Sequence, residues 1–153
     1  MTEALHVVCP LCRTTNRVRA SQLGSQPDCG KCKRPIFQAR PVALDEAGFH
    51  KHVGSSQIPV LVDFWAPWCE PCRQMTPAFG QAAAELEPQM QLVKVNTEDA
   101  PALAARLGIR SIPMLVLFLN GREVARQPGA ITSAAGIARW ARNNVPVVAK
   151  MGG

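Results

Sequence analysis

Residues 65–73 read Trp-Ala-Pro-Trp-Cys-Glu-Pro-Cys-Arg, with two cysteines separated by two residues. An apolar run at 59–65 predicts a buried strand before them, and the pattern at 70–87 predicts a helix. Cys69 then lies at the helix N-terminus, where the dipole favours a thiolate, and Cys72 lies one turn further in. Residues three apart on a helix have Cβ atoms about 5–6 Å apart, which suits a disulfide that opens and closes easily. We therefore predict a reversible redox dithiol; half a metal site and a static disulfide are the alternatives.

A second cysteine pattern occupies the N-terminal part of the chain. Two C-x-x-C pairs are separated by residues 13–28, a spacing typical of zinc ribbons. Four thiolates suit a closed tetrahedral zinc site, and about forty residues are too few to be stabilised by an apolar core alone. We therefore predict a zinc-binding module at 1–37, with two disulfides or an iron–sulfur cluster as alternatives. The predicted zinc ligands, which do not include His6, are Cys9, Cys12, Cys29 and Cys32.

Length and composition suit one ordinary domain and a smaller one, since the chain has 153 residues, of which 47% are apolar and 18% charged. Residues 1–41 hold seven basic and two acidic side chains, whereas the rest of the chain holds ten and nine. The N-terminal unit has a single aromatic side chain, Phe37, and lacks a platform for base stacking. Nucleic acid is therefore not an expected partner.

The cellular location is also expected from the sequence. The N-terminus has neither the basic start nor the apolar stretch of a secretory signal, and no run of 18 apolar residues predicts a membrane span. We expect a cytoplasmic protein, in which most thiols stay reduced. The six cysteines are accordingly interpreted as metal ligands and redox thiols.

After a short linker at 38–41, the sequence alternates between strand and helix patterns to form a predicted domain at 42–153. The order βαβαβαββα predicts an α/β fold with a mixed sheet and helices on both faces. Strands are expected near 41–44, at 59–65, at 92–96 and on both sides of the hairpin signal 120–121; helices are expected after Asp45, at 70–87 with a kink at Pro77, from Asp99 to Gly108, and at 132–144.

The segment 65–72 resembles the active site of the thioredoxins, and the resemblance covers about residues 42–145. With its four-cysteine N-terminus, the chain is similar to the bacterial thioredoxin 2 type. This implies the thioredoxin fold, preceded by a small zinc-ribbon-like module. The departure is Glu70, where the family usually has glycine; its charge is expected to disfavour the neighbouring thiolate and make the couple slightly more reducing. Further family residues follow in order at Asp63, Pro77, Lys94, 108–113, 120–121 and Gly129.

The resemblance implies a cytosolic thiol-disulfide oxidoreductase that reduces protein disulfides. Cys69 is the expected nucleophile, and Cys72 is the thiol that resolves the mixed disulfide. The chain has no dinucleotide fingerprint, so no bound organic cofactor is expected, and a flavin- and NADPH-dependent thioredoxin reductase would recharge it. We expect a monomer. The alternatives are an oxidase or isomerase, which usually has histidine between the cysteines, and a zinc-based redox sensor or chaperone-like partner-binding protein.

Two charged residues interrupt apolar strands near the dithiol. Burial would raise the pKa of Asp63, so that it would exchange a proton with Cys72 through water at neutral pH. Lys94 is its expected partner in a buried pair. The alternative is that both side chains face solvent at strand ends.

The expected substrate-binding residues surround the cysteines. The resemblance implies a cis peptide at Ile112-Pro113, lying against the dithiol and offering Ile112 backbone groups to an extended substrate. Pro71 fixes the first helical turn, and Trp68 is an expected exposed contact. The remaining features are expected to be solvated: His50, His52, Arg139 and Arg142.

Overall fold

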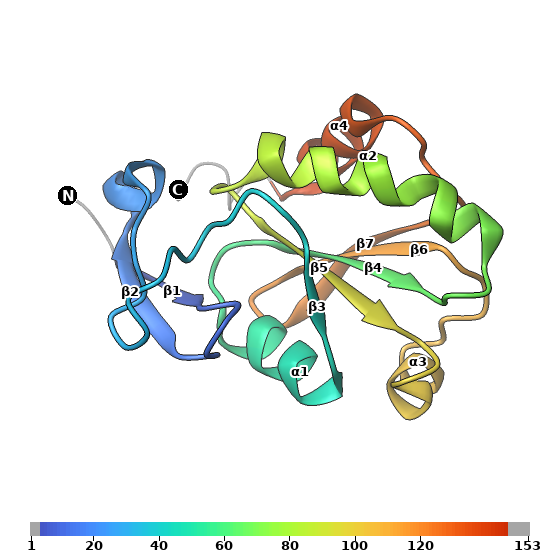
Figure 1. The fold of residues 1–153 in the computed structure, drawn as a ribbon, viewed down its shortest axis with the longest axis horizontal. Coiled ribbons are helices and arrows are strands. Elements are labelled where there is room, and N and C mark those ends of the chain that lie inside the picture. Colours follow the sequence, from blue (N-terminus) through green and yellow to red (C-terminus); the bar gives the residue numbers. More distant parts are fainter. Residues whose placement is uncertain (1–3, 147–153) are drawn as a thin grey trace.

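The computed structural model describes residues 4–146, and its N-terminal part is a small unit built on a β-hairpin. Strand β1 (Ala4–Val8) pairs antiparallel with β2 (Thr15–Arg19), and a short 3-10 helix, η1 (Ala20–Ser25), follows. The first cysteine pair lies in the turn of the hairpin, and the second lies after η1. Figure 1 shows this unit in blue, beside the larger unit.

The larger unit is a five-stranded mixed sheet with the strand order β3-β5-β4-β6-β7. Strands β3, β5 and β4 are parallel, whereas β6 and β7 run antiparallel to their neighbours. Helices α2 and α4 cover one face, and α1 and α3 the other (Figure 1). This confirms the predicted βαβαβαββα order. The elements are β3 (Val42–Leu44), α1 (Glu46–Ser55), β4 (Val60–Trp65), α2 (Glu70–Leu86), β5 (Gln91–Asn96), α3 (Pro101–Arg106), β6 (Met114–Leu119), β7 (Arg122–Pro128) and α4 (Ala134–Asn144).

Local signals in the sequence account for most of these boundaries. The side chain of Asp45 caps α1, as predicted, by accepting a hydrogen bond of 2.7 Å from the backbone N–H of Gly48. Asn120 and Gly121 both have positive φ, 52° and 80°, as the predicted type I′ hairpin requires. Helix α3 begins at Pro101, within two residues of the predicted start near Asp99, and proline occupies its first turn, where no N–H is needed.

The central strands are buried on both faces because two apolar cores enclose them. Leu61 of β4 packs in the core under α2 and α4, whereas its neighbour Val62 packs in the core over α1 and α3. Side chains alternate along a strand, so Asp63 faces the same side as Leu61. A carboxyl group is therefore placed under α2, the helix that begins at the dithiol.

The small unit is fastened to the larger one by backbone and side-chain hydrogen bonds. His6 and Gln57 exchange two bonds of 2.7 Å, from the Gln57 N–H to the His6 carbonyl and from the His6 N–H to the Gln57 side chain. The buried side chain of Gln91 donates to the carbonyl oxygen of Val8 at 3.0 Å. An ion pair of 2.8 Å joins Arg13 to Asp45, the cap of α1.

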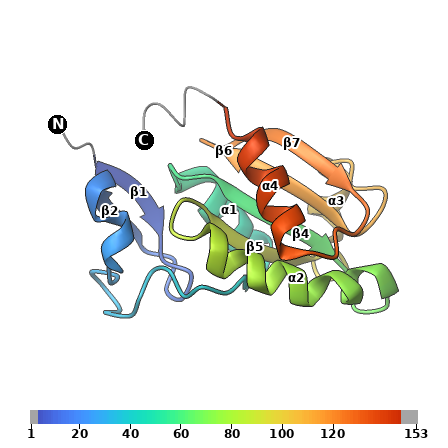
Figure 2. The ribbon, with the colours of Figure 1, turned by 90° about the horizontal axis from the view of Figure 1, so that it is seen from above.

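This interface lies at the opposite end of the sheet from the dithiol. Ile58, just before β4, packs into the apolar cluster of the small unit, while Cys69 follows the other end of that strand. Figure 2 shows the small unit beyond the C-terminal end of α2, away from the helix N-terminus. A six-residue strand is about 20 Å long, so the two cysteine sites are well separated.

His52 corrects an expectation from the sequence. It was predicted to be solvated, but it is fully buried within α1, with Nδ1 3.1 Å from the carbonyl oxygen of Gly48. Burial lowers the pKa of His52 to about 4, so the ring is neutral at physiological pH and Nδ1 carries the donated proton. The other three side chains are exposed, as predicted: His50, Arg139 and Arg142.

Within residues 4–146, no helix combines the length and the apolar character that crossing a membrane requires.

Candidate active site and metal centre

Cys69 and Cys72 form a disulfide at the start of α2, with their Cα atoms 5.2 Å apart. Cys69 is the N-cap of the helix, and its sulfur accepts a hydrogen bond of 3.2 Å from the Cys72 N–H. The exposed fraction is 4% for Cys69 and 1% for Cys72, so Cys69 is the more exposed residue of the two. Once the disulfide is opened, the same N–H and the helix dipole stabilise a Cys69 thiolate.

The loop before β6 lies against this disulfide. The Ile112-Pro113 peptide is cis, as predicted, and the carbonyl oxygen of Ile112 is 3.7 Å from the Cys69 sulfur. Ile112 also packs on the small apolar cluster that contains both cysteines, whereas Pro113 is buried. The backbone beside the reactive sulfur is thereby held in one place.

An aromatic side chain projects beside the disulfide. Trp68 is 66% exposed, and its indole N–H donates a hydrogen bond of 2.7 Å to the carboxylate of Glu98. Pro71, at the second position of α2, is also exposed. All four predicted substrate-binding residues, Trp68, Pro71, Ile112 and Pro113, therefore lie within the two segments that adjoin the dithiol.

Asp63 is fully buried, and neither carboxylate oxygen has a hydrogen-bond partner within the described part of the chain. Burial raises the pKa of Asp63 to about 7, against a smaller lowering effect from Lys94. A carboxyl group of this kind changes its protonation state near neutral pH. The buried position expected from the sequence is confirmed, and the alternative of a solvent-facing aspartate is excluded.

Lys94 does not form the direct pair that the sequence suggested. The two residues are register partners on β5 and β4, yet residues 4–146 contain no ion pair between them within 4.0 Å. The Lys94 ammonium instead lies over the ring of Trp65, 4.4 Å from its centroid. This position keeps a half-buried cation near water and over an aromatic face, which costs less than complete burial.

Two further residues at the site were not identified from the sequence. Glu98 accepts the hydrogen bond from Trp68 although the two residues are thirty positions apart in the sequence, and no local pattern indicates that contact. Arg73 contacts both Glu70 and the carbonyl oxygen of Pro67. The i,i+3 spacing of Glu70 and Arg73 on a predicted helix is the signal that could have revealed their pairing.

The four remaining cysteines converge at the hairpin of the small unit. Their sulfur atoms all lie within 4.8 Å of one another, with separations of 3.7 Å between Cys9 and Cys32 and 3.6 Å between Cys12 and Cys29. Tetrahedral zinc with Zn–S bonds of about 2.3 Å separates its sulfur ligands by about 3.8 Å. The cluster therefore fits a zinc ion, and the four residues are free thiols and not two disulfides.

The two C-x-x-C turns of this cluster, here called zinc knuckles, share one backbone geometry. In the first, the carbonyl of Cys9 accepts from the Arg13 N–H at 2.9 Å; in the second, the carbonyl of Cys29 accepts from the Lys33 N–H at the same distance. Arg13 and Lys33 both have φ of 65°. The first sulfur of each pair also accepts a backbone N–H at 3.4 Å, as expected in a site that holds thiolates.

Comparison with known proteins agrees with these two sites. The thioredoxin family matches residues 40–143, and the family described as Thioredoxin 2, N-terminal, a zinc ribbon, matches residues 8–34. Thioredoxin C-3 of Corynebacterium nephridii is 41% identical over 125 residues, which cover 82% of this chain and 86% of that protein. Thioredoxin 1 of Synechococcus elongatus is 47% identical over 89 residues, which cover 58% of this chain and 83% of that protein.

The thioredoxin of Pyropia yezoensis is 48% identical over 88 residues, 58% of this chain and 82% of that protein. The family matches cover both units and coincide with the dithiol and with the thiol cluster. The fold, with its mixed sheet and its N-terminal zinc ribbon, is the one that the sequence predicted. The chain belongs to the thioredoxin family of protein-disulfide oxidoreductases.

Proposed function

We propose that this protein reduces disulfides in other proteins through Cys69 and Cys72, and that a flavin- and NADPH-dependent thioredoxin reductase recharges it. The observation that carries the proposal is the position of the Cys69 sulfur, at a helix N-terminus and 3.7 Å from the carbonyl of Ile112. We also propose that it acts as a monomer in the cytoplasm, where a cluster of four free thiols remains available to a metal.

The proposed reaction transfers two electrons in two exchanges. The Cys69 thiolate attacks one sulfur of the substrate disulfide, forming a mixed disulfide and releasing the other substrate sulfur as a thiolate. The Cys72 thiolate then attacks the Cys69 sulfur, which breaks the mixed disulfide and releases the second substrate thiolate. The substrate is reduced, and Cys69 and Cys72 are joined. The reductase returns two electrons by the reverse exchange.

Asp63 is proposed to accept the proton that Cys72 must lose before it attacks. With a pKa of about 7, its carboxyl group is divided between both protonation states at neutral pH. It lies on the sheet face covered by α2, the helix that carries Cys72. Lys94 modulates this role through its charge, which lowers the pKa of Asp63, and not through a direct ion pair.

The substrate chain is proposed to lie in extended form beside the cis peptide. Backbone groups of Ile112 would pair with it as in a short strand, while Pro113 fixes that backbone and Trp68 supplies an exposed aromatic contact. Pro71 keeps the first turn of α2 in place beneath the reacting sulfur.

We assign the metal a structural role in this scheme. Cys9, Cys12, Cys29 and Cys32 would hold one zinc ion, whose chemistry is to cross-link the small unit. The proposed division of the chain is a zinc-binding module at 1–37, a linker at 38–41 and a thioredoxin domain at 42–153, of which the structure describes 4–146.

An insulin-reduction assay tests the proposed function. Insulin, NADPH and purified thioredoxin reductase are mixed with the wild-type protein, and NADPH oxidation and insulin precipitation are recorded together. Both signals are expected, and both should disappear in Cys69→Ser. A second arm replaces the reductase by dithiothreitol: insulin reduction in that arm alone would refute the reductase as partner. Reduction that persists without Cys69 would assign the activity to the zinc-site thiols.

Asp63→Asn is expected to stabilise the protein in a pH-dependent manner. The Asp63 carboxyl group binds its proton more tightly in the folded protein, because its pKa rises from 3.8 to about 7. Wild-type stability therefore falls as the pH rises from about 4 to about 7 and stays low above that range. The variant avoids this loss. Its free energy of unfolding should therefore equal that of the wild type near pH 4 and exceed it by roughly 4 kcal/mol at pH 8.

Denaturant unfolding at pH 4 and pH 8 measures this difference, with Asp99→Asn as the matched exposed control. Single-turnover reduction by Asp63→Asn should also show a slower second exchange at pH 8, because no carboxylate accepts the Cys72 proton. A stability gain that is equal at both pH values would contradict the buried, proton-binding role assigned to Asp63.

A further inference from the structure

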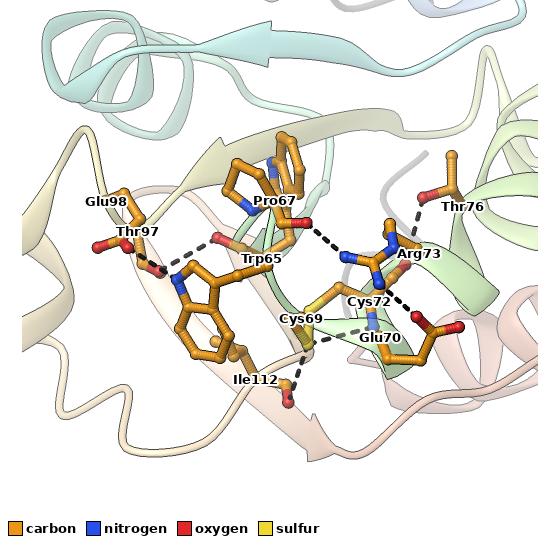
Figure 3. Close-up of a disulfide and its surroundings, with 11 residues drawn as sticks. Trp65, Pro67, Cys69, Glu70, Cys72, Arg73, Thr76, Thr97, Glu98 and Ile112 are labelled. Atoms are coloured by element: carbon orange, nitrogen blue, oxygen red, sulfur yellow. Dashed lines mark hydrogen bonds and ion pairs between the residues drawn. A yellow bond between two sulfur atoms is a disulfide. The ribbon is translucent and has the colours of Figure 1, made fainter.

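One arginine joins the first turn of α2 to the loop in front of it. The guanidinium group of Arg73 donates one hydrogen bond of 2.6 Å to the carbonyl oxygen of Pro67 and forms an ion pair with Glu70 through its other terminal nitrogen. Figure 3 shows the guanidinium between these two groups, beside the disulfide. The planar fork of arginine suits this double contact, which a lysine ammonium reproduces poorly.

The carbonyl that Arg73 holds belongs to the turn that presents Trp68. The Cys69 N–H closes this turn by donating to the Ala66 carbonyl at 3.1 Å, and the Pro67 carbonyl belongs to the peptide that leads into Trp68. The Trp68 side chain is held separately, by Glu98. An exposed aromatic residue is thus fixed at its backbone and at its ring, which lowers the entropy lost when a substrate binds against it.

The same pair sets the charge beside the reactive sulfur. From the sequence, the Glu70 carboxylate is expected to oppose the formation of a thiolate at Cys69. In the structure, that carboxylate is paired with Arg73, whose positive charge has the opposite effect. The two side chains are 64% and 51% exposed, so water screens both charges and the pair adds little to global stability. Its consequences should therefore appear in the site.

We propose that Arg73 is a positioning residue for disulfide exchange. The Glu70 carboxylate orients the Arg73 guanidinium and neutralises its charge. Arg73 in turn fixes the Pro67 carbonyl and with it the loop that carries Trp68 and Cys69. The inference rests on the disulfide reduction proposed above. It assigns a function to the glutamate that departs from the usual family sequence. Glu70 provides the anionic partner for Arg73, and Arg73 compensates for the charge that Glu70 introduces.

Four variants test the proposal: R73A, E70Q, the double variant R73A/E70Q, and R142A. Arg142 on α4 forms an exposed ion pair with Glu85 on α2, away from the dithiol, and serves as the matched control. Alkylation of the reduced protein as a function of pH gives the pKa of Cys69. Turnover is measured as kcat/KM with two substrates. Insulin is large enough to contact the loop that carries Trp68, whereas a small aromatic disulfide needs only access to the Cys69 sulfur.

R73A is expected to raise the pKa of Cys69 by about 0.2–0.7 unit, the effect of one exposed charge, and E70Q to lower it by a similar amount. The double variant should return to the wild-type pKa. With insulin, R73A and the double variant should both lose about three- to tenfold in kcat/KM, because both release the Pro67 carbonyl. With the small disulfide, the double variant should match the wild type.

Three results would overturn the proposal. In the first, R73A behaves like R142A with both substrates. In the second, the double variant recovers full insulin turnover, which would leave only a charge effect. In the third, the pKa of Cys69 is the same in R73A and E70Q. Circular dichroism shows whether R73A is folded. If it is unfolded, R73K replaces it, because lysine keeps the charge but lacks the planar fork. R73K is expected to have the wild-type pKa at Cys69 and reduced turnover of insulin. Failure of the wild type to reduce insulin would refute the proposed function separately, since the pKa comparison does not depend on it.

Discussion

Cys72→Ser is expected to accumulate mixed disulfides between Cys69 and substrate proteins. The first exchange needs only the Cys69 thiolate, whereas release of the substrate needs the second thiol, which serine cannot replace. Turnover should fall to background while a covalent adduct forms in stoichiometric amount. Non-reducing electrophoresis detects the adduct, and mass spectrometry of its proteolytic fragments identifies the cysteine that carries it.

Cys69→Ser supplies the matched control, because it should lose activity without forming any adduct. The substitution changes one sulfur atom to oxygen at a helix N-cap, a position that serine suits well, so the fold should persist. Its stability is best compared with the reduced wild type, since neither protein then contains the disulfide. An adduct attached to Cys9, Cys12, Cys29 or Cys32 would contradict the roles proposed for the two pairs.

The features that local sequence patterns specify are the ones predicted correctly. The two cysteines of the dithiol are close in sequence, and the helix that begins between them brings their Cα atoms to 5.2 Å. The zinc knuckles repeat a short backbone pattern twice, so their spacing indicates four converging sulfurs. The strand and helix order follows from hydrophobic periodicity, and Asp63 is recognisable as a charge within a buried strand.

The features missed depend on contacts between distant segments or on the path of a long side chain. His52 has the polar character of a surface residue, and its burial results from how α1 packs in the fold. Lys94 is opposite Asp63 in register, yet its four-carbon side chain allows the ammonium to reach Trp65 instead. Glu98 meets Trp68 only because the turn after β5 lies beside the dithiol. Neighbouring residues in the sequence carry no signal for these choices.

Removal of zinc is expected to unfold the N-terminal unit and leave the thioredoxin domain folded and active. The apolar cluster of the small unit contains few fully buried side chains, and two of them, Cys9 and Cys29, are proposed zinc ligands. By contrast, both cores of the larger unit consist of residues from β3 onward. Structural zinc contributes about 10–16 kcal/mol in small zinc-finger peptides, so its removal should cost the small unit most of its stability.

Metal analysis of protein purified under reducing conditions should first show one zinc per chain. After chelation, hydrogen exchange measured by mass spectrometry should show lost protection in β1 and β2, while β4 and β6 stay protected and insulin reduction continues. Ile58 and Gln91 lose their cover in this state, so the strand ends next to them should exchange somewhat faster. Cys29→Ser should reproduce the chelated pattern without any chelator, which controls for effects of the reagent. Protein that is purified without metal would refute the structural role of zinc. Global unfolding on chelation would refute the division of roles, because the dithiol would then depend on a module about 20 Å away for its fold.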